Sequence, residues 1–214
     1  MTDPKLTRIA FLLDRSGSMQ SIKTDIEGGF DAFIADQLRN PGECTVTLAQ
    51  FDNVYDVVYT RTPLRDVPPL DLQPRGSTAL LDAIGRLVTD MGAEFAALPE
   101  SQRPGTVIVA IMTDGMENSS REWTHAAVKA LIEQQTKQYD WQFLYMGADQ
   151  DAIEVGSSIG IDRERAVTYG RGKSKEAMRA TSANISAYRH AKAANPGAVL
   201  GGYTAAQRKS AVDD

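Results

Sequence analysis

Residues 7–19 of the chain read TRIAFLLDRSGSM, a short apolar run followed at once by an aspartate and two serines. The run at 7–13 is typical of a β-strand that is buried on both faces of a sheet. Asp14, Ser16 and Ser18 alternate directly after this run, and Gly17 permits a tight curve of the backbone. This stretch therefore predicts a buried strand whose end delivers three oxygen-bearing side chains to one point.

Strand-like and helix-like segments alternate along the rest of the chain. Apolar residues that recur every three or four positions predict helices at residues 22–38, 80–95, 119–137 and 174–188. Short apolar runs predict strands at residues 7–13, 45–51, 54–59, 106–113, 141–146 and 166–169. Only two residues separate the second and third runs, which predicts an antiparallel hairpin. The alternating order predicts an α/β fold, a mostly parallel sheet with helices on both faces.

Several local signals refine this prediction. Ser119, with Glu122 three residues later, is a possible capping box for the third long helix, and Asp149 is a possible cap for a short helix after it. Residues 61–76 contain four prolines and predict a loop. We expect one domain at residues 1–190 and a flexible or loosely docked C-terminal tail at 191–214.

Composition excludes several classes of protein. The 214 residues carry 23 basic and 28 acidic side chains, a net charge of −5, which argues against nucleic acid as a partner. One cysteine and two histidines are too few for a disulfide scaffold or a Cys/His zinc site. The longest apolar run, at 107–112, is far shorter than the roughly 18 residues that a membrane span needs. We expect a cytoplasmic protein with no membrane partner.

The candidate chemistry lies where the predicted strands end. Ligands of open α/β sheets bind beyond the carboxyl ends of the strands, so the loops there are expected to converge. They carry the carboxylates of Asp14 and Asp114 and the hydroxyls of Ser16, Ser18 and Thr78. All five are hard oxygen ligands, which suit Mg²⁺ or Mn²⁺.

Three segments carry a family resemblance. DRSGSM at 14–19, GSTALLDAI at 76–84 and IMTDGMENS at 111–119 resemble, in this order, the signature segments of the von Willebrand factor type A domain. The resemblance covers roughly residues 7–188. It implies a doubly wound, mostly parallel sheet of about six strands with one antiparallel edge strand. It also implies a metal-ion-dependent adhesion site formed by Asp14, Ser16, Ser18, Thr78 and Asp114.

The resemblance implies a function as well. In this family the bound cation, Mg²⁺ with Mn²⁺ or Ca²⁺ as alternatives, keeps an open position that an Asp or Glu carboxylate of a protein partner fills. The chain looks like the stand-alone bacterial or phage members, which work in protein assemblies that often contain ATPases. We therefore expect a non-enzymatic, metal-dependent protein-binding module.

Other interpretations of the same residues stay open. Asp14 with the two serines can form a simple turn, and Thr78 can cap its helix. A serine nucleophile would need His125 or His190 as its base, and neither histidine lies in a catalytic motif. Asp14 can instead be the nucleophile of a Mg²⁺-dependent hydrolase or phosphotransferase. Such enzymes usually have a second aspartate two positions later, and this chain has Ser16 there.

Some residues near the predicted site have two interpretations each. Met116, Glu117 and Trp123 follow the second aspartate and can either face a partner or pack inside the domain. A cluster of basic residues at 163–175 is expected to be a solvated face, with an acidic partner or a phosphate as the alternative. Cys44 is expected to pack at the start of a strand without a redox role.

Overall fold

A six-stranded sheet forms the centre of the computed structural model, which describes residues 2–148 and 151–212. The strand order is β3-β2-β1-β4-β5-β6. The bounds are β1 (Asp3–Asp14), β2 (Glu43–Phe51), β3 (Tyr55–Pro63), β4 (Pro104–Thr113), β5 (Gln142–Ala148) and β6 (Ala166–Tyr169). Within these residues every pairing is parallel except that of β2 with β3. The predicted α/β fold with one antiparallel edge strand is therefore confirmed.

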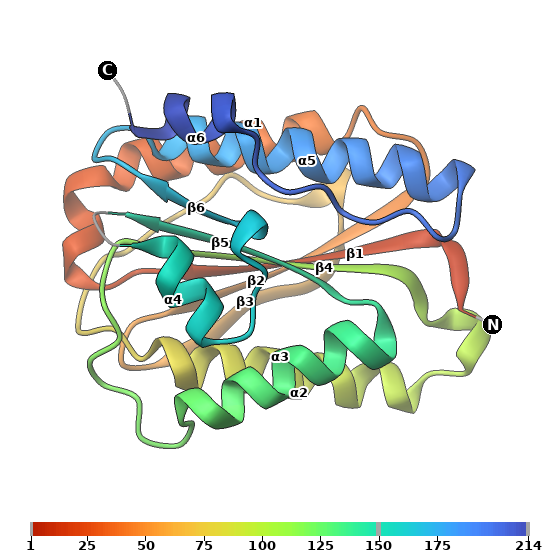
Figure 1. The fold of residues 1–214 in the computed structure, drawn as a ribbon, viewed down its shortest axis with the longest axis horizontal. Helices are drawn as coiled ribbons and strands as arrows, with labels where there is room; N and C mark the ends of the chain where they lie inside the picture. The colour runs from red at the N-terminus through yellow and green to blue at the C-terminus, as the bar shows by residue number, and fades with distance from the viewer. Residues whose placement is uncertain (1, 149–150, 213–214) are drawn as a thin grey trace.

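Helices cover both faces of the sheet (Figure 1). They are α1 (Lys23–Gln37), α2 (Leu80–Ala97), α3 (His125–Tyr139), α4 (Ala152–Ser158), α5 (Ser174–Ala194) and α6 (Ala205–Val212). In the view of Figure 1, α1, α5 and α6 lie above the sheet, and α2 and α3 lie below it. No helix among the described residues is long and apolar enough to cross a membrane.

The central strand β1 supplies both apolar layers because successive side chains of a strand point to opposite faces. Ile9, Phe11 and Leu13 pack in the layer under α1 and α5, whereas Ala10 and Leu12 pack under α2. A strand buried in this way on both faces must be apolar almost throughout. This requirement explains why the run at 7–13 is recognisable in the sequence.

Gly29 in α1 lies at a close contact between two helices. A Cβ atom at this position would lie 3.0 Å from Met178 Sδ and 3.4 Å from Lys175 Cα of α5, so α5 would have to shift by a few tenths of an ångström to admit a larger residue. The loss of intrinsic helix propensity is thus offset by close contact between the helices. The predicted apolar face of α1 is wrong at one position, because the helix ends at Gln37 and the Leu38 side chain is 49% exposed.

The hairpin is longer than predicted, and the proline-rich segment after it is well packed. β3 continues to Pro63, so the first residues of the predicted loop are part of the edge strand. Farther along, the backbone N–H groups of Leu70 and Leu72 donate to the Asp31 and Glu27 carboxylates of α1, at 2.9 and 3.0 Å. This segment therefore returns along α1 to the carboxyl edge of the sheet.

The predicted start of the third long helix is wrong. α3 begins at His125 with Thr124 as its N-cap, and the Thr124 hydroxyl accepts a hydrogen bond from Ala127 N. Residues 119–123 form an irregular loop instead of a capping box. The predicted cap Asp149 lies outside the described residues, and the Asp151 carboxylate caps α4.

The chain after residue 190 is mostly exposed up to Val199, but Leu200, Tyr203 and Ala211 are buried against the domain. α5 continues through the predicted boundary to Ala194, and the Tyr203 hydroxyl lies 2.6 Å from Thr181 Oγ1 of that helix. In α6, an Arg208 N–H donates to Ala166 O of the edge strand at 2.6 Å. These contacts hold the C-terminal segment over β6.

Candidate metal site

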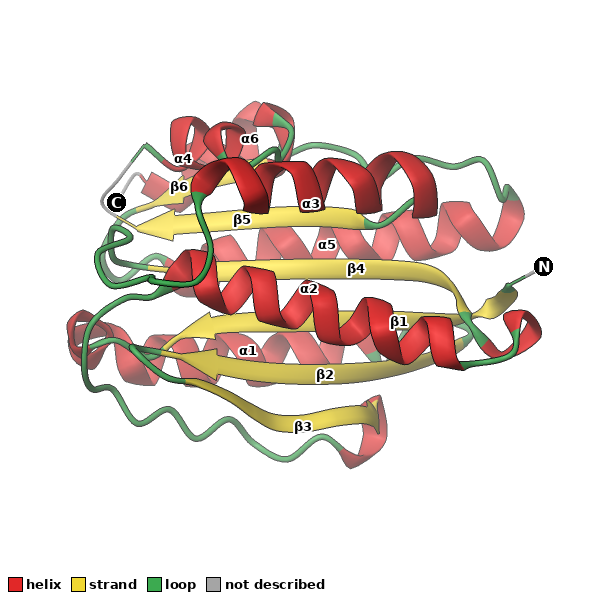
Figure 2. Ribbon diagram, turned by 90° about the horizontal axis from the view of Figure 1, so that it is seen from below, coloured by secondary structure: helices red, strands yellow, loops and turns green. Residues whose placement is uncertain are grey.

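The strand order brings the two predicted aspartates together. β1 and β4 are neighbours in the sheet, and Leu13 pairs with Met112 near their carboxyl ends. Asp14 is the last residue of β1, and Asp114 follows directly after β4. Figure 2 shows the loops that follow the parallel strands gathered at this one edge. The predicted convergence of the loops at the carboxyl edge is therefore observed.

Asp14 is fully buried and anchored through both carboxylate oxygens. Its Oδ1 accepts the Ser16 N–H at 2.6 Å, and its Oδ2 accepts the Thr113 hydroxyl at 2.5 Å. Burial raises the pKa of Asp14 to about 6, and the charge of Asp114 adds to the increase, although the hydrogen bonds from Thr113 and Ser16 oppose it. The neighbouring Arg15 pairs with Asp52 and Asp56 and so does not compensate the Asp14 charge. A bound cation would supply that compensation.

The two serines connect the first loop to Asp114. Ser16 Oγ and Ser18 Oγ lie 3.1 Å apart, and the Ser18 hydroxyl donates to Asp114 Oδ1 at 2.6 Å. Ser16 is buried, whereas Ser18 is exposed at the edge of the sheet. The first and third loops thus present a continuous set of oxygen atoms, from the buried Asp14 to the surface.

Thr78 completes the group from the second loop. A Cβ atom built on Gly115 would lie 2.9 Å from Thr78 Oγ1 and 3.8 Å from Ser18 Oγ, so the two hydroxyls approach Gly115 from two loops. Thr78 N donates to Asn118 Oδ1, and Asn118 N donates to Thr78 O, both at 3.0 Å. The structure therefore places all five predicted ligands around one point.

The proposed role of Thr78 as a helix cap is wrong. The N-cap of α2 is Ala79, and the side chain of this residue makes no capping hydrogen bond. Instead Glu117, on the loop after Asp114, accepts the N–H of Leu81 at 2.9 Å and that of Ser120 at 2.7 Å. Thr78 thus has no capping role, and the Glu117 carboxylate belongs to the framework of the site.

The other two residues considered as partner contacts, Met116 and Trp123, differ in burial. Trp123 is half-buried over Gly85 of α2, in agreement with the interpretation that it packs inside the domain. Met116 is 73% exposed beside Asp114. Of the three residues considered as partner contacts, only Met116 stands out from the surface.

The set of ligands fits a hard divalent cation. Two carboxylates and three hydroxyls provide oxygen atoms only, as Mg²⁺, Mn²⁺ and Ca²⁺ prefer. The described residues contain no group of three or more His, Cys, Asp or Glu side chains that could hold a metal. A cation at this edge would therefore depend on the serine and threonine hydroxyls as well as the two aspartates.

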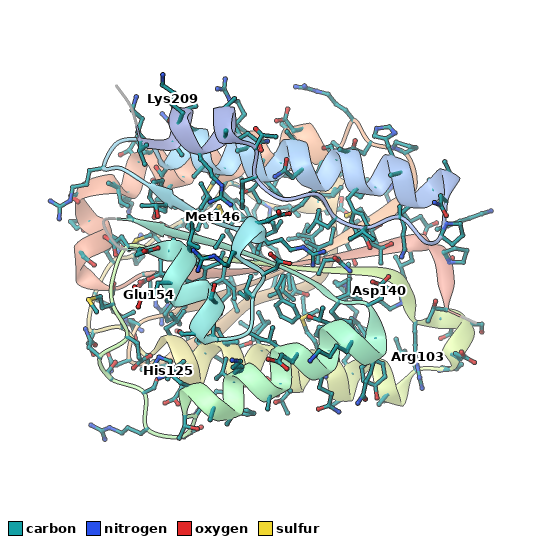
Figure 3. The ribbon with its side chains drawn as sticks, in the orientation of Figure 1. Arg103, His125, Asp140, Met146, Glu154 and Lys209 are labelled. Atoms are coloured by element: carbon teal, nitrogen blue, oxygen red, sulfur yellow. The ribbon has the colours of Figure 1, made fainter. Side chains whose placement is uncertain are left out.

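Neither histidine serves as a base for the two serines in the described part of the chain. In the described part of the chain, the hydroxyls of Ser16 and Ser18 bond to each other and to Asp114, not to a histidine. His125 is exposed at the start of α3 (Figure 3). His190 follows Arg189, which binds Pro41 O shortly before β2 begins, so it lies at the opposite edge of the sheet.

Asp82 anchors the loop that follows the candidate site. Its carboxylate accepts the N–H groups of Arg121, Glu122 and Trp123 at 2.8–2.9 Å. Burial opposes ionisation, but these three hydrogen bonds outweigh it and hold the pKa of Asp82 below its ordinary value of 3.8. We expect Asp82→Asn to lower the free energy of unfolding by about 1–2 kcal/mol at pH 7, because the amide offers a single oxygen and no charge.

The loss of unfolding free energy in Asp82→Asn is expected to depend on pH in a defined direction. Because the pKa is depressed in the folded state, the carboxylate stabilises the fold at neutral pH, and the effect fades below pH 3.8. The difference between wild type and Asp82→Asn in urea unfolding should therefore shrink as the pH falls from 7 to 3. A difference that grew on acidification would show that these hydrogen bonds do not favour the charged form.

Comparisons with known proteins agree with this architecture. No protein-family model and no curated protein matches the sequence. Among solved structures, the von Willebrand factor domain of the pilus tip protein Mfa5 from Porphyromonas gingivalis matches with a TM-score of 0.61 at 12% identity, over 84% of this chain and 94% of that one. The VWA2 protein of Sulfolobus acidocaldarius matches with a TM-score of 0.55 at 14% identity, over 83% of this chain and 44% of that one.

A third match carries a metal. The proximal thread matrix protein 1 of the mussel byssus, with a zinc-occupied adhesion motif, matches with a TM-score of 0.59 at 15% identity, over 86% of this chain. The chain spans less than half the length of this protein and of the Sulfolobus protein. The fold is therefore that of a von Willebrand factor A domain.

Proposed function

We propose that this protein is a non-enzymatic, metal-dependent protein-binding module. The proposal is that Asp14, Ser16, Ser18, Thr78 and Asp114 hold a divalent cation of the Mg²⁺ type. The observation that supports it is the convergence of these five oxygen-bearing side chains at one edge of the sheet, where Asp14 is fully buried and the neighbouring Arg15 pairs with Asp52 and Asp56 instead. When bound, the cation supplies a coordination position that accepts an Asp or Glu carboxylate of the partner.

The residues of the chain itself keep the ligands in place. Thr113 fixes one oxygen of Asp14, and Asn118 ties the Thr78 backbone to the loop that carries Asp114. Such outer hydrogen bonds orient ligands before a cation arrives. Beside them a polar hollow of about 390 Å³ lies between the hairpin tip, the start of α2 and the loop at 119–122.

The main alternative is a Mg²⁺-dependent hydrolase or phosphotransferase with Asp14 as its reactive group. A carboxylate nucleophile needs an oxygen that the substrate can reach. Asp14 is fully buried, and both of its oxygens accept hydrogen bonds from the chain. This geometry favours a structural ligand over a nucleophile.

Several finer features belong to the same proposal. We place Mg²⁺ before Mn²⁺ or Ca²⁺, since hydroxyls and two carboxylates suit a small hard cation. We also propose a cytoplasmic location and a partner in a protein assembly that contains an ATPase, as in the stand-alone bacterial and phage proteins that the sequence resembles. Nucleic acid is not a proposed partner because the net charge is −5.

The partner chemistry can be tested with random peptides selected on the immobilised protein in Mg²⁺ and eluted with EDTA. We expect every eluted peptide to contain Asp or Glu, and its Asn or Gln counterpart to lose binding. The Asp114→Ala protein is expected to retain at least tenfold less peptide, because it lacks one of the two carboxylates. Recovery of peptides without acidic residues, or equal retention by the variant, would contradict the proposal.

A further inference from the structure

One buried carboxylate outside the proposed ligand set binds two arginines. Asp52 lies at the tip of the β2–β3 hairpin, and its side chain is 1% exposed. Its Oδ2 accepts the Arg15 Nε–H at 3.0 Å and the Arg75 Nε–H at 2.8 Å. Its Oδ1 accepts Val54 N at 2.6 Å, which fixes the carboxylate relative to the hairpin backbone.

Both arginines belong to the loops that carry the proposed ligands. Arg15 stands between Asp14 and Ser16, and its carbonyl oxygen accepts Arg75 N at 2.7 Å. The Asp52 carbonyl oxygen accepts Ala79 N, the residue after Thr78, at 2.9 Å. The hairpin tip is thus joined to the first and second loops on both sides of the ligand positions.

The network has a second carboxylate that differs mainly in burial. Asp56 also pairs with Arg15, and its Oδ2 lies 3.8 Å from Arg75 Nη2, but its side chain is 48% exposed. Burial opposes the ionisation of Asp52, but the hydrogen bonds from Arg75 and Val54 and the charge of Arg15 outweigh it and lower its pKa. Asp52 therefore remains charged at neutral pH inside the protein.

We propose that Asp52, through Arg15 and Arg75, is a positioning residue that sets the affinity of the candidate site for its cation. The inference rests on the proposed function, since it concerns the same site. The Asp52 carboxylate joins the Arg15 side chain of the first loop to the Arg75 side chain of the second loop. Without it the ligand loops lose their common anchor.

Electrostatics alone would give a different pattern of effects. Loss of the Asp52 charge would weaken cation binding, and loss of the Arg75 charge would strengthen it, because a positive group repels a cation. Positioning predicts that both changes weaken binding, since each breaks the same connection. It also predicts that Asp56→Asn has little effect, although this change removes the same charge from the same two arginines.

The test is calorimetric titration of Mn²⁺ and Mg²⁺ into the metal-stripped full chain and its Asp52→Asn, Arg75→Gln and Asp56→Asn variants. We expect the dissociation constant to rise about tenfold in Asp52→Asn, as for other residues that orient metal ligands. Arg75→Gln should also bind more weakly, and Asp56→Asn should stay within about threefold of wild type. Circular dichroism of the metal-free proteins checks that each variant is folded at the titration temperature.

Other results would contradict either the positioning role of Asp52 or the proposed function itself. Three results would overturn the positioning role alone. They are unchanged affinity in Asp52→Asn, equal losses in Asp52→Asn and Asp56→Asn, and tighter binding by Arg75→Gln. No cation binding by wild type would overturn the proposed function and this inference with it. If Asp52→Asn does not fold, Arg75→Gln decides the matter, because its side chain is 61% exposed and its replacement leaves the core intact.

Discussion

Asp14→Asn is expected to abolish the rise in melting temperature that Mg²⁺ gives the wild-type protein. At a cation concentration 100 times the dissociation constant, binding stabilises the wild type by about 2.7 kcal/mol. For a domain of this size that corresponds to a shift of roughly 5–10 °C. Asparagine keeps an oxygen for the Ser16 N–H but removes the charge that the cation would compensate.

The metal-free variant is expected to be at least as stable as the metal-free wild type. Wild-type Asp14 is a buried carboxylate near a second one, Asp114, and both burial and that charge disfavour ionisation. Thermal unfolding with and without Mg²⁺ measures both effects, and Asp36→Asn, on the exposed side of α1, is a control that should keep the full shift. A normal Mg²⁺ shift in Asp14→Asn would contradict the site assignment.

The largest effect on stability is expected at Phe30. Its ring is fully buried between α1 and the sheet, with the Phe11 ring centroid 5.2 Å away in an edge-to-face arrangement. Phe30→Ala removes these contacts and leaves a cavity, so the free energy of unfolding should fall by about 3–5 kcal/mol. Urea unfolding followed by circular dichroism measures the change.

A matched control for Phe30 lies at the end of the same helix. Leu38 is 49% exposed, and Leu38→Ala is expected to change the free energy of unfolding by no more than about 0.5 kcal/mol. Similar losses in the two variants would mean that α1 does not pack on the sheet through the face described. The comparison separates burial from a general effect of shortening a side chain.

The fold is predictable from the sequence because its determinants are local. Strand β1 is buried on both faces and must be apolar throughout, while α2 carries its apolar residues on one face, so each leaves a recognisable pattern. The two residues between the apolar runs of the hairpin indicate its turn. Parallel strands bring their carboxyl ends to one edge, so the strand pattern predicts that Asp14 and Asp114 lie together if their strands are neighbours, as β1 and β4 are.

The errors arise where distant residues decide the local structure. Ser119 and Glu122 suggest a capping box, but the Asp82 carboxylate from α2 binds the backbone at 121–123, and α3 starts at His125. The sequence predicts a flexible or loosely docked segment after residue 190, and the specific contact of the Tyr203 hydroxyl with Thr181 is defined only in the folded structure.

The framework of the site is only partly visible in the sequence. Thr113 and Asn118 stand inside the segment 111–119, but their partners Asp14 and Thr78 are far away along the chain. Asp52 resembles an ordinary turn residue, and its contacts with the two arginines depend on the folded loops. The types of candidate ligand can be inferred from a sequence motif. The groups that orient them can be identified only from the three-dimensional structure.

The most direct test of the central claim is calorimetric titration of Mg²⁺, Mn²⁺ and Ca²⁺ into the metal-stripped protein, beside Asp114→Ala. The variant keeps the buried framework, because Asp114 lies half-exposed at the surface. The account predicts binding of at least one of these cations at a single site in wild type and a loss of at least a hundredfold in affinity in the variant. No binding to wild type, or equal binding by the two proteins, would contradict it.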